Sequence, residues 1–151
     1  MTSEHQADQQ HLEAAMAYAV SGDRVAAGAE LARIYNKGTN HMYRVWVALA
    51  ETAVHPIREA GRPGAVYGLS VLNADSGRRT SIDEAPPGVR LATQFLTAQA
   101  NQDTDTTRAL FRAALAGQVE VMADAMPMLL DAAVASARAQ LAARDTRGKS
   151  A

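Results

Sequence analysis

Apolar residues recur at helical spacing in six segments of this chain, and a turn signal ends each segment. Apolar residues three and four positions apart lie on one side of a helix, so each segment predicts an amphipathic helix. Aromatic residues make up only 5% of the chain while alanine is abundant, which favours closely packed helices over strands. We therefore predict an all-α fold, a compact bundle of about six helices.

Turn residues set the expected helix boundaries. Ser21-Gly22-Asp23 ends the first helix, and Asp23 is the expected N-cap of the second. Gly38 suits the left-handed position that follows a helix end, and Thr39 or Asn40 then caps the third helix. The predicted helices span Asp8–Val20, Arg24–Asn36, His41–Ala60, Val89–Asn101, Thr104–Ala116 and Val119–Arg144.

The segment between the third and fourth helices has a different composition. Val66–Leu72 and Arg79–Ile82 have the composition of short strands, and Ala74–Gly77 is a turn sequence between them. An isolated hairpin is marginal in water, so this insert forms a hairpin lying on the helices or stays a loop. Pro127 interrupts the last helix and is expected to kink it or split it near Met126.

The chain is expected to form one helical domain around this insert. A first helical triplet spans residues 8–60, the insert 61–88 and a second triplet 89–145, with frayed tails at 1–7 and 146–151. A shift of 80 positions superimposes the triplets without a gap and places Asp23 on Asp103 and Leu49 on Leu129. Helix lengths, capping aspartates and apolar phases agree together, so either a duplication or two generic helical triplets explain the pattern.

The second and fifth predicted helices are each entered through a turn that carries Asp, with the sequences SGD and NQD. These units are similar to the helix-turn-helix units of tetratricopeptide-type proteins over about 25 residues in each half. The aromatic and proline signature of that family is missing from both units. The resemblance therefore implies an architecture of paired helices and no function.

Charge and composition exclude several classes of protein. The formal net charge is −1, which gives no general attraction to nucleic acid or to an acidic membrane surface. The chain has no cysteine, which excludes disulfides, thiolate catalysis and cysteine-ligated metals. Neither a signal peptide nor a long apolar run is found, and arginine far outnumbers lysine. We expect a cytoplasmic protein from a GC-rich bacterial genome.

The third predicted helix carries the candidate site. Met42, Val45, Trp46, Leu49, Ala53 and Ile57 form its apolar face, so this helix is expected to lie at the centre with Trp46 as a core anchor. The opposite stripe combines imidazole, carboxylate and guanidinium groups, which are those of His41, Arg44, Glu51, His55 and Arg58.

This polar stripe has a structural interpretation and two chemical ones. The structural interpretation, which we favour, is a solvated helix face with pairing between residues four apart. Glu51 and His55 have the spacing of two metal ligands, but a site needs more ligands, and the second half has Asp131 with Ala135 in place of the histidine. Arg44 and Arg58 would line an anion pocket instead. Arg44 is also expected to pair with Asp124 or Asp131 across a seam between the two long helices.

No Gly-rich phosphate loop, nucleophile elbow or zinc-protease motif is present, so we expect no catalysis, no cofactor and no metal. The predicted function is a helical protein–protein interaction or regulatory module, either binding a protein partner or forming a homodimer through the long helices, and binding neither nucleic acid nor membrane. The alternative is a small-molecule-binding domain with a pocket between the triplets near Trp46 and His55; a metal-dependent enzyme using Glu51 is less favoured. The expected partner- or ligand-binding residues are Tyr43, Arg44, Trp46, Glu51, His55 and Arg58.

Overall fold

The computed structural model describes residues 2–72 and 76–149 and confirms the all-α class. Its described residues form six α-helices, one short antiparallel hairpin and a single 3-10 turn at Ile82–Glu84. The helices are α1 Thr2–Ser21, α2 Arg24–Tyr35, α3 Thr39–Ala60, α4 Pro87–Ala100, α5 Thr104–Ala116 and α6 Val119–Lys149. Within this part of the chain, no helix has both the length and the apolar character that crossing a membrane requires.

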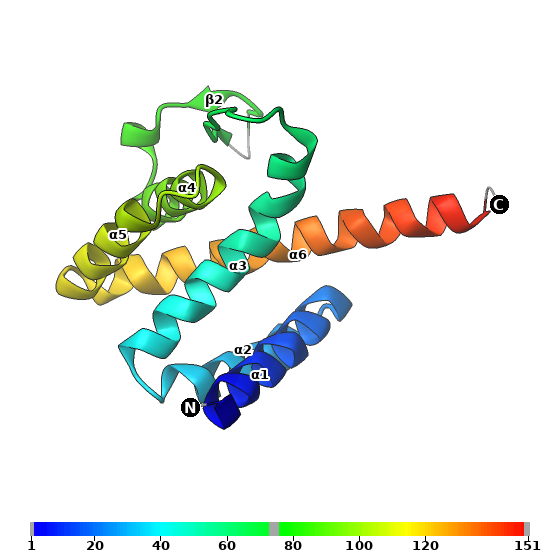
Figure 1. The fold of residues 1–151 in the computed structure, drawn as a ribbon. Helices are drawn as coiled ribbons and strands as arrows, with labels where there is room; N and C mark the ends of the chain where they lie inside the picture. The colour runs from blue at the N-terminus through cyan, green and yellow to red at the C-terminus, as the bar shows by residue number, and fades with distance from the viewer. Residues whose placement is uncertain (1, 73–75, 150–151) are drawn as a thin grey trace.

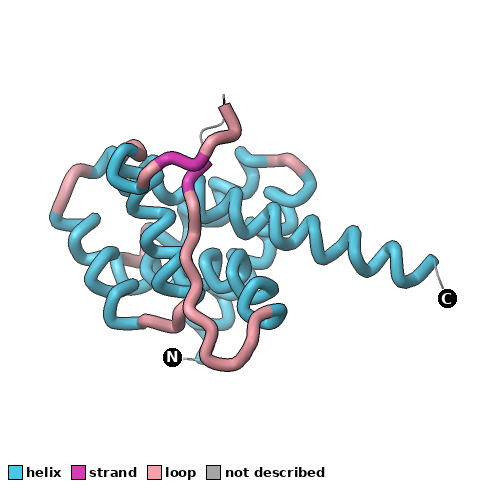
Figure 2. The backbone as a smooth tube through the Cα atoms, turned by 90° about the horizontal axis from the view of Figure 1, so that it is seen from above, coloured by secondary structure: helices cyan, strands magenta, loops and turns pink. Residues whose placement is uncertain are grey.

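Helices α3 and α6 form the centre of the molecule. They cross each other in Figure 1, with the α1–α2 pair on one side and the α4–α5 pair on the other. The last part of α6 extends beyond the other helices, which Figure 2 shows from a second direction. This arrangement puts the two longest helices where their apolar faces meet each other.

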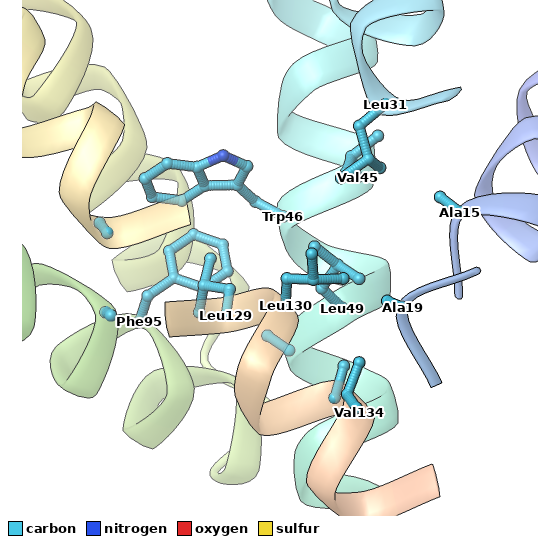
Figure 3. Packing of buried hydrophobic residues seen from close by; sticks show 14 of the residues in the cluster. Ala15, Ala19, Leu31, Val45, Trp46, Leu49, Phe95, Leu129, Leu130 and Val134 are labelled. Carbon is cyan, nitrogen blue, oxygen red and sulfur yellow. The ribbon is translucent and has the colours of Figure 1, made fainter. Parts of the chain in front are cut away.

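Trp46 of α3 anchors the core, as its sequence context predicts. Its side chain is only 1% exposed and packs edge to face on Phe95 of α4 and Phe111 of α5, with ring centroids 5.4 and 5.3 Å away. Figure 3 shows Trp46 above Phe95, beside Leu129 of α6. Tyr43 adds a tilted contact with Phe111 at 5.3 Å. The few aromatic residues thus join α3 to the second helical triplet.

Local capping agrees with the sequence at two of the three predicted positions. Asp23 accepts a hydrogen bond from the Ala26 amide at 2.9 Å, and Asp103 accepts one from the Thr106 amide at 3.0 Å. The prediction of Thr39 or Asn40 as the cap of α3 is wrong, because α3 begins at Thr39 and its N-cap is Gly38. Gly38 has a φ of +119°, a value that glycine adopts without strain.

The tails predicted at both ends are wrong over the described residues. Helix α1 begins at Thr2, and Asp8 ties its N-terminal half to the start of α3. Helix α6 continues to Lys149 because its last turns consist mostly of good helix formers such as alanine and arginine. It also passes through Pro127 without being split, since buried Ala125 and Leu129 hold the chain on both sides of the proline.

The insert contains the predicted hairpin, but its strands are shorter than expected. Strands β1 Val71–Leu72 and β2 Arg79–Thr80 pair antiparallel, and the predicted turn falls partly on residues 73–75, outside the described part. The segment before β1 crosses the helices as an extended loop in Figure 2. It bonds to α4 instead of to a second strand, because the Asn101 side chain accepts from the Tyr67 amide and donates to the Tyr67 carbonyl, both at 2.8 Å.

Candidate binding grooves beside α3

The polar stripe of α3 does not form one site, because its residues face different neighbours. Arg58 donates to both carboxylate oxygens of Glu51, and Gln99 of α4 donates to Glu51 at 2.8 Å. The hydrogen bond from Arg58 lowers the pKa of the Glu51 carboxyl, and the same bond raises the pKa of Arg58. Glu51 and Arg58 therefore fasten α3 to α4, and Arg58 is unavailable to an anion pocket with Arg44.

His55 lies on the same side of α3 but is half exposed. Its Nδ1 lies 3.4 Å from Glu51 and its Nε2 3.2 Å from Glu59, so pairing between residues four apart continues along this face. No group of three or more histidine and acidic residues in the described chain has a geometry that would hold a metal ion. The pair of Glu51 and His55 thus has no third ligand among these residues.

Arg44 is exposed and forms no ion pair with another described residue. The seam predicted between Arg44 and Asp131 is wrong, because Asp131 pairs with Arg24 of α2 instead. The reason is the packing of α3 on α6, which brings apolar Leu49 and Leu129 into the shared core. Arg44 belongs to the opposite stripe of α3 and therefore faces away from α6.

Arg44 instead borders a partly open groove between α1 and α3, with a volume of about 540 Å³. Five apolar side chains line the groove, which are Leu12, Met16, Ile34, Val45 and Ala48. Its polar lining residues are His5, Asp8, Gln9 and Glu13 on α1 and His41, Arg44 and Thr52 on α3. We call this the α1–α3 groove.

One end of the α1–α3 groove is closed by a charged cluster. Asp8 of α1 is 8% exposed and lies 2.5 Å from Nζ of Lys37 and 2.5 Å from Nδ1 of His41. Burial raises the pKa of the Asp8 carboxyl, but hydrogen bonds from Lys37 and His41 outweigh it and leave the pKa lowered. Asp8 is therefore a carboxylate whose charge is compensated locally.

A second groove of about 540 Å³ lies on another side of α3, at the base of the extending part of α6. Its lining is almost wholly apolar and includes Ile57, Leu69, Leu96, Ala132, Ser136, Ala139 and Ala143. Ile57 was expected on the buried face, yet it is 46% exposed, because the end of α3 reaches beyond the central core. We call this the α3–α6 groove, and it shares no lining residue with the α1–α3 groove.

The six sequence-predicted site residues are therefore dispersed. Trp46 is buried among aromatic rings, and Tyr43 contacts Phe111 and lines a smaller pocket of about 210 Å³ between α3 and α5. Arg44 alone of the six borders the α1–α3 groove. Sequence reasoning missed both grooves, because each depends on how far apart neighbouring helices lie.

The comparisons with known proteins provide no relative from which to interpret these grooves. No protein-family model matches the chain, and neither curated proteins nor solved structures give a match. The function must therefore be inferred from the geometry of this chain.

Proposed function

We propose that this chain is a non-catalytic interaction module that self-associates through the α3–α6 groove and the end of α6. The observation that carries the proposal is the extension of α6 beyond the body directly from an apolar groove. Every described side chain from residue 139 to residue 148 is exposed. We call residues 139–149 the α6 arm.

Small side chains follow one side of α6 from the groove into the arm. They are Ala132, Ser136, Ala139, Ala143 and Thr146, at alternating intervals of four and three residues. This interval is the seven-residue repeat with which one helix packs along another, and small side chains let two backbones approach closely. The stripe thus offers a helix-packing surface that runs from the α3–α6 groove into the exposed arm.

A two-fold axis near residue 141 would give both copies the same contact between arm and groove. It would lay the arm of each copy antiparallel over the groove of the other, along a shared helix length of about 27 Å for residues 132–149. The groove lining contains no charged group, so covering the groove desolvates no charge on that side of the contact. It would also pack a helical arm that is marginal in water without tertiary contacts.

The test is the mass of the full chain in solution, measured by sedimentation equilibrium between about 5 and 200 μM, a range that brackets micromolar affinities. The expected result is a dimer of twice the 16.0 kDa chain mass. Ala139→Glu places a charge in the stripe and is expected to give a monomer, whereas Ala142→Glu, also exposed but outside the groove lining, leaves the dimer intact. A wild-type monomer over the whole range would refute the proposal.

A further inference from the structure

The two helical triplets differ at the α1–α3 groove. In the second triplet, Gly88 of α4 packs so closely on α6 that an added Cβ would lie 2.4 Å from Cβ of Asp124. The shift of 80 positions that superimposes the triplets places Asp8 on Gly88 and Arg44 on Asp124. Gly88 therefore allows α4 and α6 of the second triplet to lie in close contact. At the matching positions of the first triplet, Asp8 and Arg44 line an open groove between α1 and α3.

Two charged side chains of this groove, Arg44 and Glu13, form no ion pair with another described residue. Asp8 forms an ion pair with Lys37 and contacts His41, and it does not pair with Arg44. Glu13, on α1, accepts a hydrogen bond from the neutral amide of Gln9 at 3.0 Å and keeps its negative charge. Arg44 therefore presents its guanidinium to solvent at the edge of an apolar groove, with no ion-pair partner in the described chain.

We propose that the α1–α3 groove binds an amphiphilic carboxylate, with its apolar body along Leu12, Met16 and Ala48 and its carboxylate on Arg44. The planar guanidinium donates two parallel hydrogen bonds to a carboxylate, which an ammonium or a neutral head group does not match. The volume of about 540 Å³ lies within the range of small-molecule sites. The apolar residues of the lining would contact the tail of such a ligand, and Arg44, a cation without an ion-pair partner in the described chain, would bind its charged end.

Arg44 lies on the groove side nearest the beginnings of α1 and α3. The contact of Asp8 with His41 shows that these two helices start close together, each near its own N-terminal end. Backbone amide dipoles favour an anion at a helix N-terminus, so this end suits the carboxylate and the other end suits the tail. The predicted orientation therefore places the tail toward Met16 and Thr52.

The probes are decanoate and its uncharged counterpart decanol, each titrated into the full chain by calorimetry below the concentration at which decanoate aggregates. We expect one decanoate per chain, and we expect Arg44→Gln to weaken its binding about tenfold through loss of a charge-assisted hydrogen bond. Decanol binding should be the same for Arg44→Gln and the wild type. Arg112→Gln, which removes an exposed arginine of α5 that does not line the α1–α3 groove, is the matched control and should leave decanoate binding unchanged.

Groove-filling variants locate the bound ligand. Ala48→Phe is expected to abolish binding of both probes, and Thr52→Phe is a second blocker, used if the first fails to fold by circular dichroism. Absence of decanoate binding, or binding that Arg44→Gln does not weaken, would overturn the proposal. Self-association is tested separately, because Ala139→Glu lies in the other groove and should bind decanoate like the wild type.

Discussion

The carboxylate of Asp8 on α1 contacts the imidazole of His41 on α3, with 2.5 Å between Oδ2 and Nδ1. Lys37, in the turn between α2 and α3, reaches the other carboxylate oxygen. The contact joins two helices that are otherwise separated by the α1–α3 groove. It therefore orders the beginning of α1, a region that its polar composition alone suggests is frayed.

Replacing Asp8 with asparagine should destabilise the fold. The change removes the carboxylate charge that pairs with Lys37 and contacts the His41 imidazole in a nearly buried place, and we expect a loss of about 2 kcal/mol in the free energy of unfolding. Urea unfolding at pH 7, followed by fluorescence of the single tryptophan Trp46, measures the loss. Asp145→Asn, which changes an exposed acid at the end of α6, is the control and should shift the urea midpoint very little.

At low pH, the wild type should lose the extra stability that Asp8 gives it over the Asp8→Asn variant. The pKa of Asp8 is lower in the folded chain than its unfolded value of about 3.9, so its contribution is fully present above that value. The contribution is lost as pH falls through the lowered folded pKa. Urea midpoints of the wild type and Asp8→Asn should therefore differ at pH 5 and converge toward pH 2. A difference that persists unchanged at pH 2 would show that the effect is not electrostatic.

Structural features that depend on interactions within one helix could be predicted from the sequence. Asp23 and Asp103 were predicted as helix caps because a cap bonds to amides three residues away. The burial of Trp46 followed from the width of the apolar face of α3. These features depend on one helix at a time, so periodicity and spacing were enough to find them.

Features that depend on two helices were predicted poorly. A helical wheel places Arg44 on a stripe but gives no crossing angle, so the pairing of Asp131 with Arg24 could not be foreseen. The α1–α3 groove likewise follows from the distance between α1 and α3. Gly88 allows α4 to pack closely on α6, but the sequence alone does not show this role, because it depends on how the two helices meet.

Adding a methyl group at Gly88 should separate α4 from α6. An alanine Cβ there would lie 2.4 Å from Cβ of Asp124 and 3.2 Å from the Ala125 backbone nitrogen, and backbone cannot move aside as a flexible side chain can. We expect Gly88→Ala to cost about 2 kcal/mol in thermal or urea unfolding.

The matched control for Gly88→Ala lies in the middle of α2. An added Cβ at Gly28 meets no atom within 4 Å, so Gly28→Ala should gain about 0.5–1 kcal/mol from helix propensity. Equal destabilisation by both substitutions would mean that close packing of α4 on α6 is not what Gly88 provides.

The hydroxyl of Tyr35 should be dispensable for stability. Tyr35 Oη and Trp46 Nε1 are both buried without a hydrogen-bond partner in the described structure. Burial raises the pKa of the Tyr35 phenol, an effect that the neighbouring indole lessens although its geometry falls short of a hydrogen bond. Tyr35→Phe removes an unsatisfied polar group, so we expect unchanged stability or a gain of up to about 1 kcal/mol in urea unfolding. A clear loss would reveal a hydrogen bond made in solution.

The Asn101 side chain should control how firmly the loop before β1 lies on the helices. Its amide mimics a strand partner by accepting from the Tyr67 amide and donating to the Tyr67 carbonyl, and Tyr67 Oη also donates to the Arg58 carbonyl at 3.2 Å. Asn101→Ala removes both amide bonds, so chymotrypsin should cleave after Tyr67 several-fold faster while the helices keep their circular dichroism. Gln102→Ala, which changes the next exposed residue, should leave the cleavage rate as in the wild type. Equal cleavage rates in both variants would mean that Tyr67 is held by its hydroxyl alone.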